Sequence, residues 1–368
     1  MAVKKSSKSG VRPVERWEGV AAIGIDLSDR SAEFHALEGK ANTIGTGKVT
    51  LLSSELQRWA SEIPATVIAI EAGTHSPWVS RLLEANGHKV IVANPVKVAL
   101  ITKNIKKRDR VDAELLARLA LVDPFLLFPI RHRGEQAQID LQMIRTREIA
   151  VQLRTKTIGH VRGAVKSFGG RVPKCATEAF VKTAKEAIPE ALQPAMGPML
   201  GLIDELTTTI AGYDEQIEKL VKERYPEVVR VTQIKGVGAL TGLAFVLVLE
   251  DAARFQSSRS VGAFVGLTSK QDQSGDDDPQ RGITKAGDRL LRRLLIQSAH
   301  YILGHFGKEC DLRRHGEKIA ARGGKRAKKR ASTAVARKLS VLMHRLWVSG
   351  ETYDPLYNSR KAQLEVAA

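Results

Sequence analysis

Cysteine is almost absent from this sequence. The chain of 368 residues contains only Cys175 and Cys310, which lie far apart. Two such residues form neither the framework of a disulfide-stapled protein nor the paired spacing of a zinc site. The sequence therefore predicts a soluble protein of a reducing compartment, with a cytoplasmic location.

Long hydrophobic runs are also missing. A membrane-spanning helix needs roughly 18 apolar residues, and the longest run, Ala239–Leu249, is interrupted by Thr241 and Gly242. Residues 1–16 are basic and rich in serine, without the apolar core of a signal peptide. We therefore expect residues 1–17 to form a flexible basic tail, and we expect no membrane partner.

Negative charge is scarce relative to positive charge. The chain has 58 Lys and Arg residues against 40 Asp and Glu residues, which gives a net charge of +18 at pH 7. An excess of this size is typical of proteins that bind a polyanion, most simply nucleic acid. Binding to an acidic membrane surface is the competing interpretation.

Residues 20–93 have the pattern of an α/β domain. Segments at 20–28, 31–39 and 42–51 are predicted strands, and a helix–strand–helix–strand–helix order follows. This order predicts a mixed sheet covered by helices. With its closing helix, the domain is assigned to residues 18–125.

Two long helices are predicted next, at residues 135–166 and 197–223. The second has apolar residues spaced alternately by three and four, which is the heptad seam of a coiled coil. The seam residues are Ile203, Leu206, Ile210, Tyr213, Ile217 and Leu220. The seam can pair with the helix 135–166 of the same chain or with a second chain. Residues 126–228 are assigned to this coiled-coil and linker region.

A mainly helical region is predicted at residues 229–350, before a C-terminal tail at 351–368. It begins with "TQIKGVGALTGLAFV", which resembles a helix-hairpin-helix whose glycine turn presents backbone N–H groups to a phosphate. A simple glycine-rich junction between helices is the alternative. The phosphate contacts would come from Lys235, Gly236 and Gly238.

The densest positive charge lies further along this region. Residues 311–346 contain twelve Lys and Arg residues against two acids. The run adjoins a helix with an apolar face, so its charge is expected to form a phosphate-binding surface. The residues assigned to this surface are Lys325, Arg326, Lys328, Lys329 and Arg330.

Four carboxylates in the first domain need an explanation. Asp26 and Glu71 end apolar strands, and Asp109 and Asp112 begin the closing helix. On a helical wheel these two aspartates extend the apolar face, although a buried unpaired carboxylate is costly. An N-cap and a first-turn acid, both favoured by the helix dipole, are the alternative explanation.

The carboxyl ends of neighbouring strands meet at one edge of a sheet, and a helix that crosses the sheet can bring its own acids there. Four carboxylates without obvious cationic partners need divalent cations, and Mg²⁺ prefers such oxygen ligands. We therefore predict that the four acids bind two Mg²⁺ ions. Two ions about 4 Å apart can activate an oxygen nucleophile and stabilise the leaving oxygen at a phosphodiester.

Three segments, "GIDLS", "AIEAG" and "DRVDA", resemble the DEDD motif of IS110-type insertion-sequence transposases. A second block, "GAFVGLTSKQDQSGDDDPQRGITKAGDRLLRRLLIQSA", is similar to the C-terminal transposase domain of that family. The resemblance covers most of residues 20–350. It implies a ribonuclease-H-like (RuvC-like) first domain that contains the four acids, a helical serine domain, and a site-specific DNA recombinase.

The resemblance also implies a mechanism. The family's serine, which precedes a glycine, attacks the DNA backbone, and Ser274 matches it by position. A noncoding bridge RNA, transcribed from an end of the element, pairs with both target and donor DNA. The implied partners are therefore duplex DNA and a structured RNA.

The residues around Ser274 match this role in part. A serine hydroxyl is a poor nucleophile until it is activated, and no sequence neighbour is an obvious base; the acids of the first domain can activate it if the two domains meet. Asp276–Asp278 stand where the family has glycines and a basic residue, and Ser269 is the fallback nucleophile. An arginine-rich stretch that can line phosphates follows: Arg281, Lys285, Arg289, Arg292 and Arg293.

Two other functions are compatible with the sequence. A metal-dependent nuclease, such as a junction resolvase, would use the four acids without serine chemistry. A non-catalytic nucleic-acid-binding scaffold is disfavoured, because acids repel phosphate unless a metal intervenes. For a recombinase, which exchanges strands between two duplexes, we expect a dimer held partly by the heptad seam and a tetramer on paired DNA.

Overall fold

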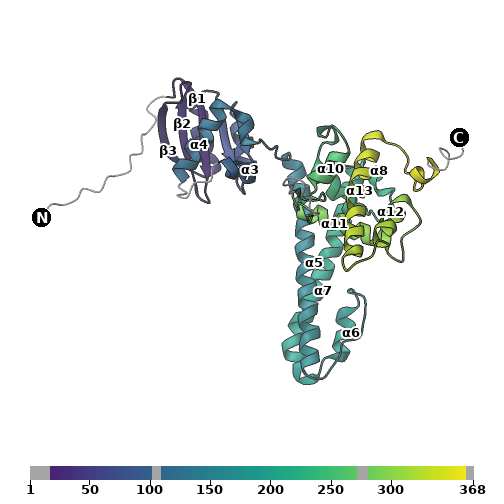
Figure 1. Ribbon diagram of the computed structural model, residues 1–368. Helices are drawn as coiled ribbons and strands as arrows, with labels where there is room; N and C mark the ends of the chain where they lie inside the picture. Colours follow the sequence, from purple (N-terminus) through teal and green to yellow (C-terminus); the bar gives the residue numbers. More distant parts are fainter. Residues whose placement is uncertain (1–16, 102–108, 272–280, 362–368) are drawn as a thin grey trace. The chain divides into compact units, whose positions relative to one another are not determined.

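The computed structural model describes residues 17–101, 109–271 and 281–361 (Figure 1). The chain divides into two compact units, Met1–Arg133 and Gly134–Ala368. The first unit is α/β and the second is helical. No helix in the described ranges is long and apolar enough to cross a membrane.

A five-stranded sheet with the order β3-β2-β1-β4-β5 forms the first unit. Its strands are β1 (Val20–Leu27), β2 (Ser31–Glu38), β3 (Thr43–Thr50), β4 (Val67–Glu71) and β5 (Lys89–Ala93). β2 is antiparallel to both β1 and β3, whereas β4 is parallel to β1 and to β5. The mixed sheet predicted from the sequence is confirmed, and it fits a ribonuclease-H-like domain.

Helices cover both faces of this sheet. They are α1 (Ser53–Ser61), α2 (Ser76–Ala85), α3 (Pro95–Ile101) and α4 (Asp109–Val122), followed by the 3-10 turn η1 (Pro124–Leu127). On one face, Ile23 and Ile25 of β1 share a core with Leu56 of α1. On the other face, Ala22 of β1 shares a core with Leu116 of α4. The alternation along β1 therefore decides which side chains meet α4.

Gly24 sets the distance between β1 and α4. A methyl group at this position would lie 2.0 Å from the carbonyl oxygen of Ala113 and 2.4 Å from the amide nitrogen of Ala117. The backbone of α4 therefore lies directly on the strand, which a residue without a Cβ permits. Asp26, two residues further along β1, shares this face of the sheet.

The second unit begins with the two long helices that the sequence predicts, α5 (Glu135–Ser167) and α7 (Gln193–Glu223). They pack against each other as an antiparallel pair (Figure 1). A short helix, α6 (Phe180–Ala187), and the 3-10 turn η2 (Glu190–Leu192) lie between them in the chain. In Figure 1 the two long helices run side by side, with α6 beside the end where the chain turns back.

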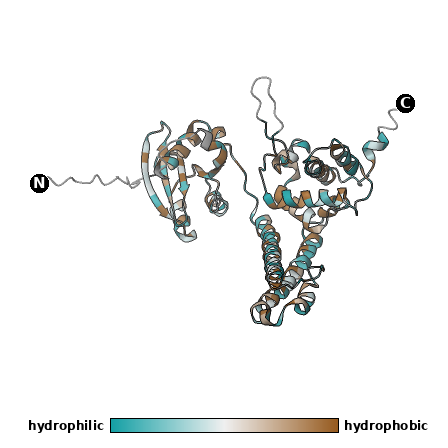
Figure 2. Cartoon of the chain, turned by 60° about the horizontal axis from the view of Figure 1, so that its bottom comes forward, coloured by the Kyte–Doolittle hydropathy of each residue, from teal (hydrophilic) through white to brown (hydrophobic). Residues whose placement is uncertain are grey.

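The heptad seam of α7 packs within its own chain. Ile203, Ile210 and Ile217 are at most 4% exposed, and α5 is the main neighbour of α7. Figure 2 shows hydrophobic and hydrophilic residues interspersed along each of the two helices. The first of the two predicted partners, the helix of the same chain, is therefore the one that covers the seam.

Shorter helices complete the second unit. They are α8 (Val228–Thr232), α9 (Ala239–Leu249), α10 (Arg259–Phe264), α11 (Arg289–Leu303), α12 (Asp311–Ala320) and α13 (Ala327–Ser349), with the 3-10 turn η3 (Ala252–Arg254) after α9. Residues 241–249 of α9 are all buried. This central helix shares one core with α5, α7, α11 and α13, so the long helix pair is part of the same unit.

An ion pair between a buried carboxylate and an exposed arginine joins α5 to the end of α7. Asp140 accepts a hydrogen bond from Nη1 of Arg224 at 2.8 Å and from the hydroxyl of Tyr225 at 2.7 Å. Burial alone would raise the pKa of Asp140, but the hydrogen bonds from Tyr225 and Arg224 outweigh it and lower that pKa. Asp140 is therefore charged at neutral pH and fixes the direction of α5.

Replacing Gly24 tests the contact between β1 and α4. We expect Gly24→Ala to lower the free energy of unfolding of the first unit by about 3 kcal/mol, because the added methyl group meets backbone atoms that cannot rotate away. Urea unfolding followed by circular dichroism measures the change. Gly39→Ala is the matched control, since a Cβ there meets nothing within 4 Å. An unchanged unfolding midpoint for Gly24→Ala would contradict the close contact.

Candidate active site and nucleic-acid surface

Two of the predicted acids lie on neighbouring strands. In the parallel pair of β1 and β4, Ile25 lies opposite Ile70, and Asp26 and Glu71 are the next residues along their strands. Ile25 and Ile70 pack in the core on the α1 and α2 side, so Asp26 and Glu71 point to the opposite face, which α4 covers. Both acids are partly exposed.

α4 directs its first turn to the same edge of the sheet. Ala113 lies over Gly24, and Arg118, further along the helix, donates a hydrogen bond to the carbonyl oxygen of Ala41 at 3.4 Å. Ala41 lies in the turn after β2, at the end of the sheet where β1 begins. α4 therefore runs antiparallel to β1, and Asp112 lies toward the end where β1 stops. We call this end of β1 and β4 the acidic edge.

The acidic edge places the predicted acids on one face and at one end of the sheet. Asp112 is partly buried on α4, and Asp109 is the first residue of that helix, although its side chain lies outside the described residues. In the described ranges, no three acidic, histidine or cysteine side chains are close enough to hold a metal ion. Carboxylates that lie close together repel one another unless a cation lies between them. The donor chemistry, which is all carboxylate oxygen, fits a hard divalent cation.

Residues that the sequence did not single out position the loop after Glu71. The hydroxyl of Ser76 bonds to both the amide and the carbonyl of Gly73, each at 2.9 Å, and lies 2.8 Å from Nε2 of His132. Burial lowers the pKa of His132, with Arg81 and Arg133 adding to the effect. A neutral imidazole therefore contacts this loop through Ser76. In the sequence, the local indication of the loop is the Ser-Pro pair at the start of α2.

Ser274 lies outside the described residues, but the chain on both sides of it is described. Ser269 forms a β-bridge with Ile283, and the amide of Lys270 donates to the carbonyl oxygen of Gly282 at 2.9 Å. Ser269, the fallback nucleophile, is exposed at this bridge. The two ends of the serine segment are therefore held together.

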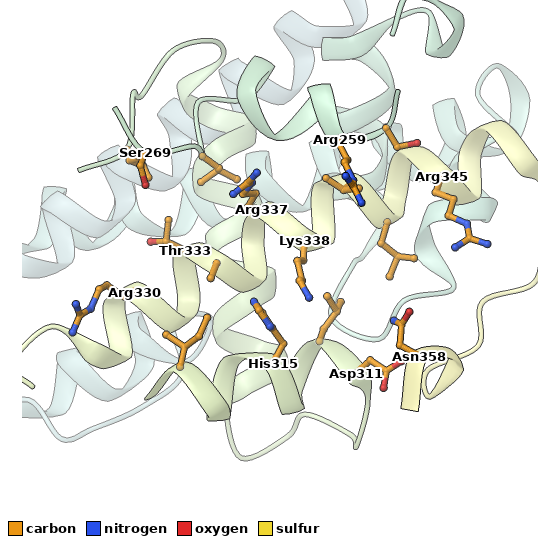
Figure 3. Close-up of a pocket in the computed structure, with 18 of the residues that line it drawn as sticks. Arg259, Ser269, Asp311, His315, Arg330, Thr333, Arg337, Lys338, Arg345 and Asn358 are labelled. Carbon is orange, nitrogen blue, oxygen red and sulfur yellow. Dashed lines mark hydrogen bonds between the residues drawn. The ribbon is translucent and has the colours of Figure 1, made fainter. Parts of the chain in front are cut away.

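A groove of about 1800 Å³ opens beside this bridge (Figure 3). Residues of α10, α12 and α13 line it, together with Ser269, Arg281 and residues 351–358. Ten Lys and Arg residues and three Asp and Glu residues are among them. The groove is therefore strongly positive, which suits a polyanion.

The predicted basic residues divide into two groups. Arg281 and four of the five residues in the dense run, Lys325, Arg326, Lys329 and Arg330, line the groove, whereas Lys328 is exposed outside the groove lining. Lys285 and Arg289 are also exposed outside it.

Arg292 and Arg293 instead make contacts within the protein. Arg292 donates to the carbonyl oxygens of Val265 at 3.1 Å and Ala286 at 2.6 Å, and Arg293 pairs with Glu148 of α5. These contacts hold the segment after the serine loop. Both guanidinium groups are therefore less available to bind phosphate than the sequence predicts.

The glycine turn joins α8 and α9 as either interpretation of the sequence requires. Gly236 has a φ of +98°, and a Cβ there would lie 2.7 Å from the ring of Tyr301. Lys235 and Gly238 are exposed, and all three turn residues lie outside the groove lining. The turn therefore packs against α11 on one side and offers Lys235 to solvent on the other.

Comparison with known proteins covers both units. A transposase family model of the IS110 DEDD type matches residues 23–169, and the model of the IS116/IS110/IS902 transposase family matches residues 229–312. The transposase for insertion sequence element IS1111A of Coxiella burnetii is 30% identical over 91% of this chain and 91% of its own length. A putative transposase of Sinorhizobium fredii is 29% identical over 91% of this chain and 86% of its own length. A probable family 20 transposase of Pseudomonas aeruginosa is 27% identical over 80% and 87%.

These matches define the class of protein as an insertion-sequence transposase, an enzyme that acts on DNA. The chain belongs to the IS116/IS110/IS902 family of transposases. Its DEDD domain, which contains the acidic edge, suggests that the enzyme uses a divalent metal.

Proposed function

We propose that this transposase cuts and rejoins DNA through a phosphodiester between Ser274 and the DNA, with Mg²⁺ at the acidic edge and a bridge RNA that selects the DNA sites. The main support is the acidic edge itself. Asp26 and Glu71 lie at adjacent strand positions on one face, under the helix that begins with Asp109 and contains Asp112. Carboxylates at this place would repel a DNA phosphate unless a cation lay between them, so the acids fit a DNA-cutting enzyme best when they hold a metal.

Asp26, Glu71, Asp109 and Asp112 would hold the metal, as two Mg²⁺ ions. When bound, the metal supplies activation of an oxygen nucleophile and neutralises charge on the leaving oxygen. The protein supplies the fixed carboxylates, because the contact at Gly24 keeps α4 against β1. The partial exposure of Asp26 and Glu71 leaves the edge open to a DNA backbone.

Removing one carboxylate tests the metal proposal. Asp112→Asn keeps the size of the side chain but removes its charge, so we expect strand cleavage to fall by about 100-fold or more. Duplex binding, measured on the same preparation by gel shift, should change little because the groove cations lie in the other unit. Glu114→Gln is the matched control, since Glu114 pairs with Arg118 at 2.8 Å on the same helix. Full cleavage activity in EDTA would refute metal dependence.

Ser274 is proposed as the nucleophile on its family position and on the groove beside its segment. Its hydroxyl oxygen would form a bond to a DNA phosphorus while the bond to a sugar oxygen breaks, the serine proton passing to a base and the sugar oxygen taking up a proton. Phosphate groups held by the cations that line the groove, such as Arg281, would bring the DNA to this segment. Rejoining reverses the step with a different sugar hydroxyl.

Mapping the covalent adduct tests the nucleophile. We expect a DNA phosphate on Ser274 when the reaction is trapped, digested and examined by mass spectrometry. Ser274→Ala should lose the adduct completely, and Ser269→Ala should keep it, because only the first substitution removes the attacking oxygen. An adduct on Ser269 overturns the assignment. DNA cleavage that continues without any adduct would instead indicate a metal-dependent nuclease.

The proposed partners are duplex target and donor DNA, a structured RNA, and further copies of the chain. The large positive charge supports the nucleic-acid partners. A dimer, and a tetramer on paired DNA, follow from the need to exchange strands between two duplexes. The heptad seam lends this little support, because α5 of the same chain is the main neighbour of α7 and the seam residues Ile203, Ile210 and Ile217 are already buried.

Purification from host cells tests both kinds of partner. We expect the complex to contain a structured RNA, identified by sequencing, and two chains, counted by light scattering. Ribonuclease treatment should abolish recombination, because the RNA would select both DNA sites. Heat-denatured ribonuclease is the control. Recombination by RNA-free protein would refute guidance, and an active single chain would refute the dimer.

A further inference from the structure

Most of the positive charge in the groove is uncompensated. Ten Lys and Arg residues line the groove. Arg345 pairs with Glu351 at 3.2 Å, and Arg281 is also engaged in an interaction within the protein. The other eight have no carboxylate partner in the part of the chain that the structure describes. Cations held close together without acids repel one another, so the groove is most stable with a bound anion.

The three acids of the groove are already engaged. Asp311 accepts a hydrogen bond from the amide of Asn358 at 2.7 Å and another from the hydroxyl of Ser359. Asp354 pairs with Arg360, and Glu351 pairs with Arg345 as described. These contacts attach the C-terminal residues 351–361 to one end of the groove. They leave the groove-lining Lys and Arg residues between positions 322 and 338 without a carboxylate partner in the described residues.

His315 lies among those cations. It is a partly buried residue of α12, and Figure 3 shows it with Lys338 of α13 in the cavity between the two helices. Burial lowers the pKa of His315, and Lys338, Arg322 and Lys318 lower it further. The nearest acid one turn earlier on the helix, Asp311, is bound to the C-terminal segment. The imidazole is therefore neutral at pH 7 while the groove is empty.

We infer that His315, Lys338 and Arg322 form a binding site for a phosphate of a nucleic-acid backbone, and that His315 takes up a proton when the phosphate binds. The inference rests on the proposed function, because it requires nucleic acid in the groove. All three side chains line the groove. His315 and Lys338 come from α12 and α13, two helices that pack directly against each other, and Arg322 lies in the turn that follows α12. A phosphate among them accepts charge-assisted hydrogen bonds from all three groups once the imidazole is protonated.

Proton uptake makes the affinity depend on pH in a defined direction. A phosphate stabilises the protonated imidazole, so the bound state holds one more proton than the free state. By linkage, affinity then rises as pH falls, by at most tenfold per pH unit for one proton. Lys and Arg contacts alone give no such slope between about pH 6 and about pH 8, because both side chains stay charged there.

The experiment measures the affinity of the full chain for a short fluorescent DNA duplex, by anisotropy, at constant ionic strength. We expect the wild-type protein to bind about fivefold more tightly at about pH 6 than at about pH 8. His315→Gln should bind with a flat pH profile. His305→Gln, which removes an exposed histidine outside the groove, should keep the wild-type slope. A slope that survives in His315→Gln, or no slope in the wild type, overturns the inference.

A second measurement does not depend on any variant. Calorimetric titration of the wild-type chain with the same duplex, in buffers of different ionisation enthalpy, counts the protons taken up; we expect up to one, and zero would overturn the inference. Repeating it with an RNA duplex shows which backbone occupies the site, since only the occupant drives uptake. If neither duplex binds at all, the proposed function of the groove fails, whereas binding without proton uptake contradicts only the site at His315.

Discussion

The close contact of α4 with β1 at Gly24 is the constraint on which the chemistry of the first unit depends. A helix whose backbone lies directly on a strand has little freedom to slide or tilt, because Ala113 and Ala117 leave no space for a Cβ. The same contact, with the antiparallel direction of α4, turns the first turn of the helix toward the ends of β1 and β4. The acidic edge is therefore a property of the backbone arrangement before any cation binds.

The two units differ in the charge of their candidate functional surfaces. The first has the carboxylates, which attract cations and repel phosphate, and the second has a groove in which positive charge is in large excess. α5 joins the acidic unit to the basic one in sequence, and the ion pair between Asp140 and Arg224 fixes its direction within the second unit. Arg145 of α5 also pairs with Asp288, which caps α11, at 3.0 Å.

Local periodicity predicted the elements well, and long-range contacts set the limits. Alternation identified the strands of the sheet, and the face shared by Gly24 and Asp26 follows from it. The seam of α7 was equally consistent with either partner, because a heptad records that a surface is buried but not what buries it. Arg292 and Arg293 looked like phosphate contacts, yet one bonds backbone carbonyls and the other pairs with Glu148, 145 residues away in sequence. The groove was foreseen as a charge run but not as a cavity, because α12, α13 and the C-terminal segment form it jointly.

Metal binding at the acidic edge is the central claim, and it can be measured without any reaction. Titrating the full chain with Mn²⁺, as a spectroscopic probe for Mg²⁺, and following the free ion by electron paramagnetic resonance counts the bound ions. The account predicts that Asp26→Asn and Glu71→Gln each lose this binding. Glu114→Gln, which removes a carboxylate of α4 that pairs with Arg118, should bind Mn²⁺ as the wild type does. Equal Mn²⁺ binding by all four proteins would contradict the claim.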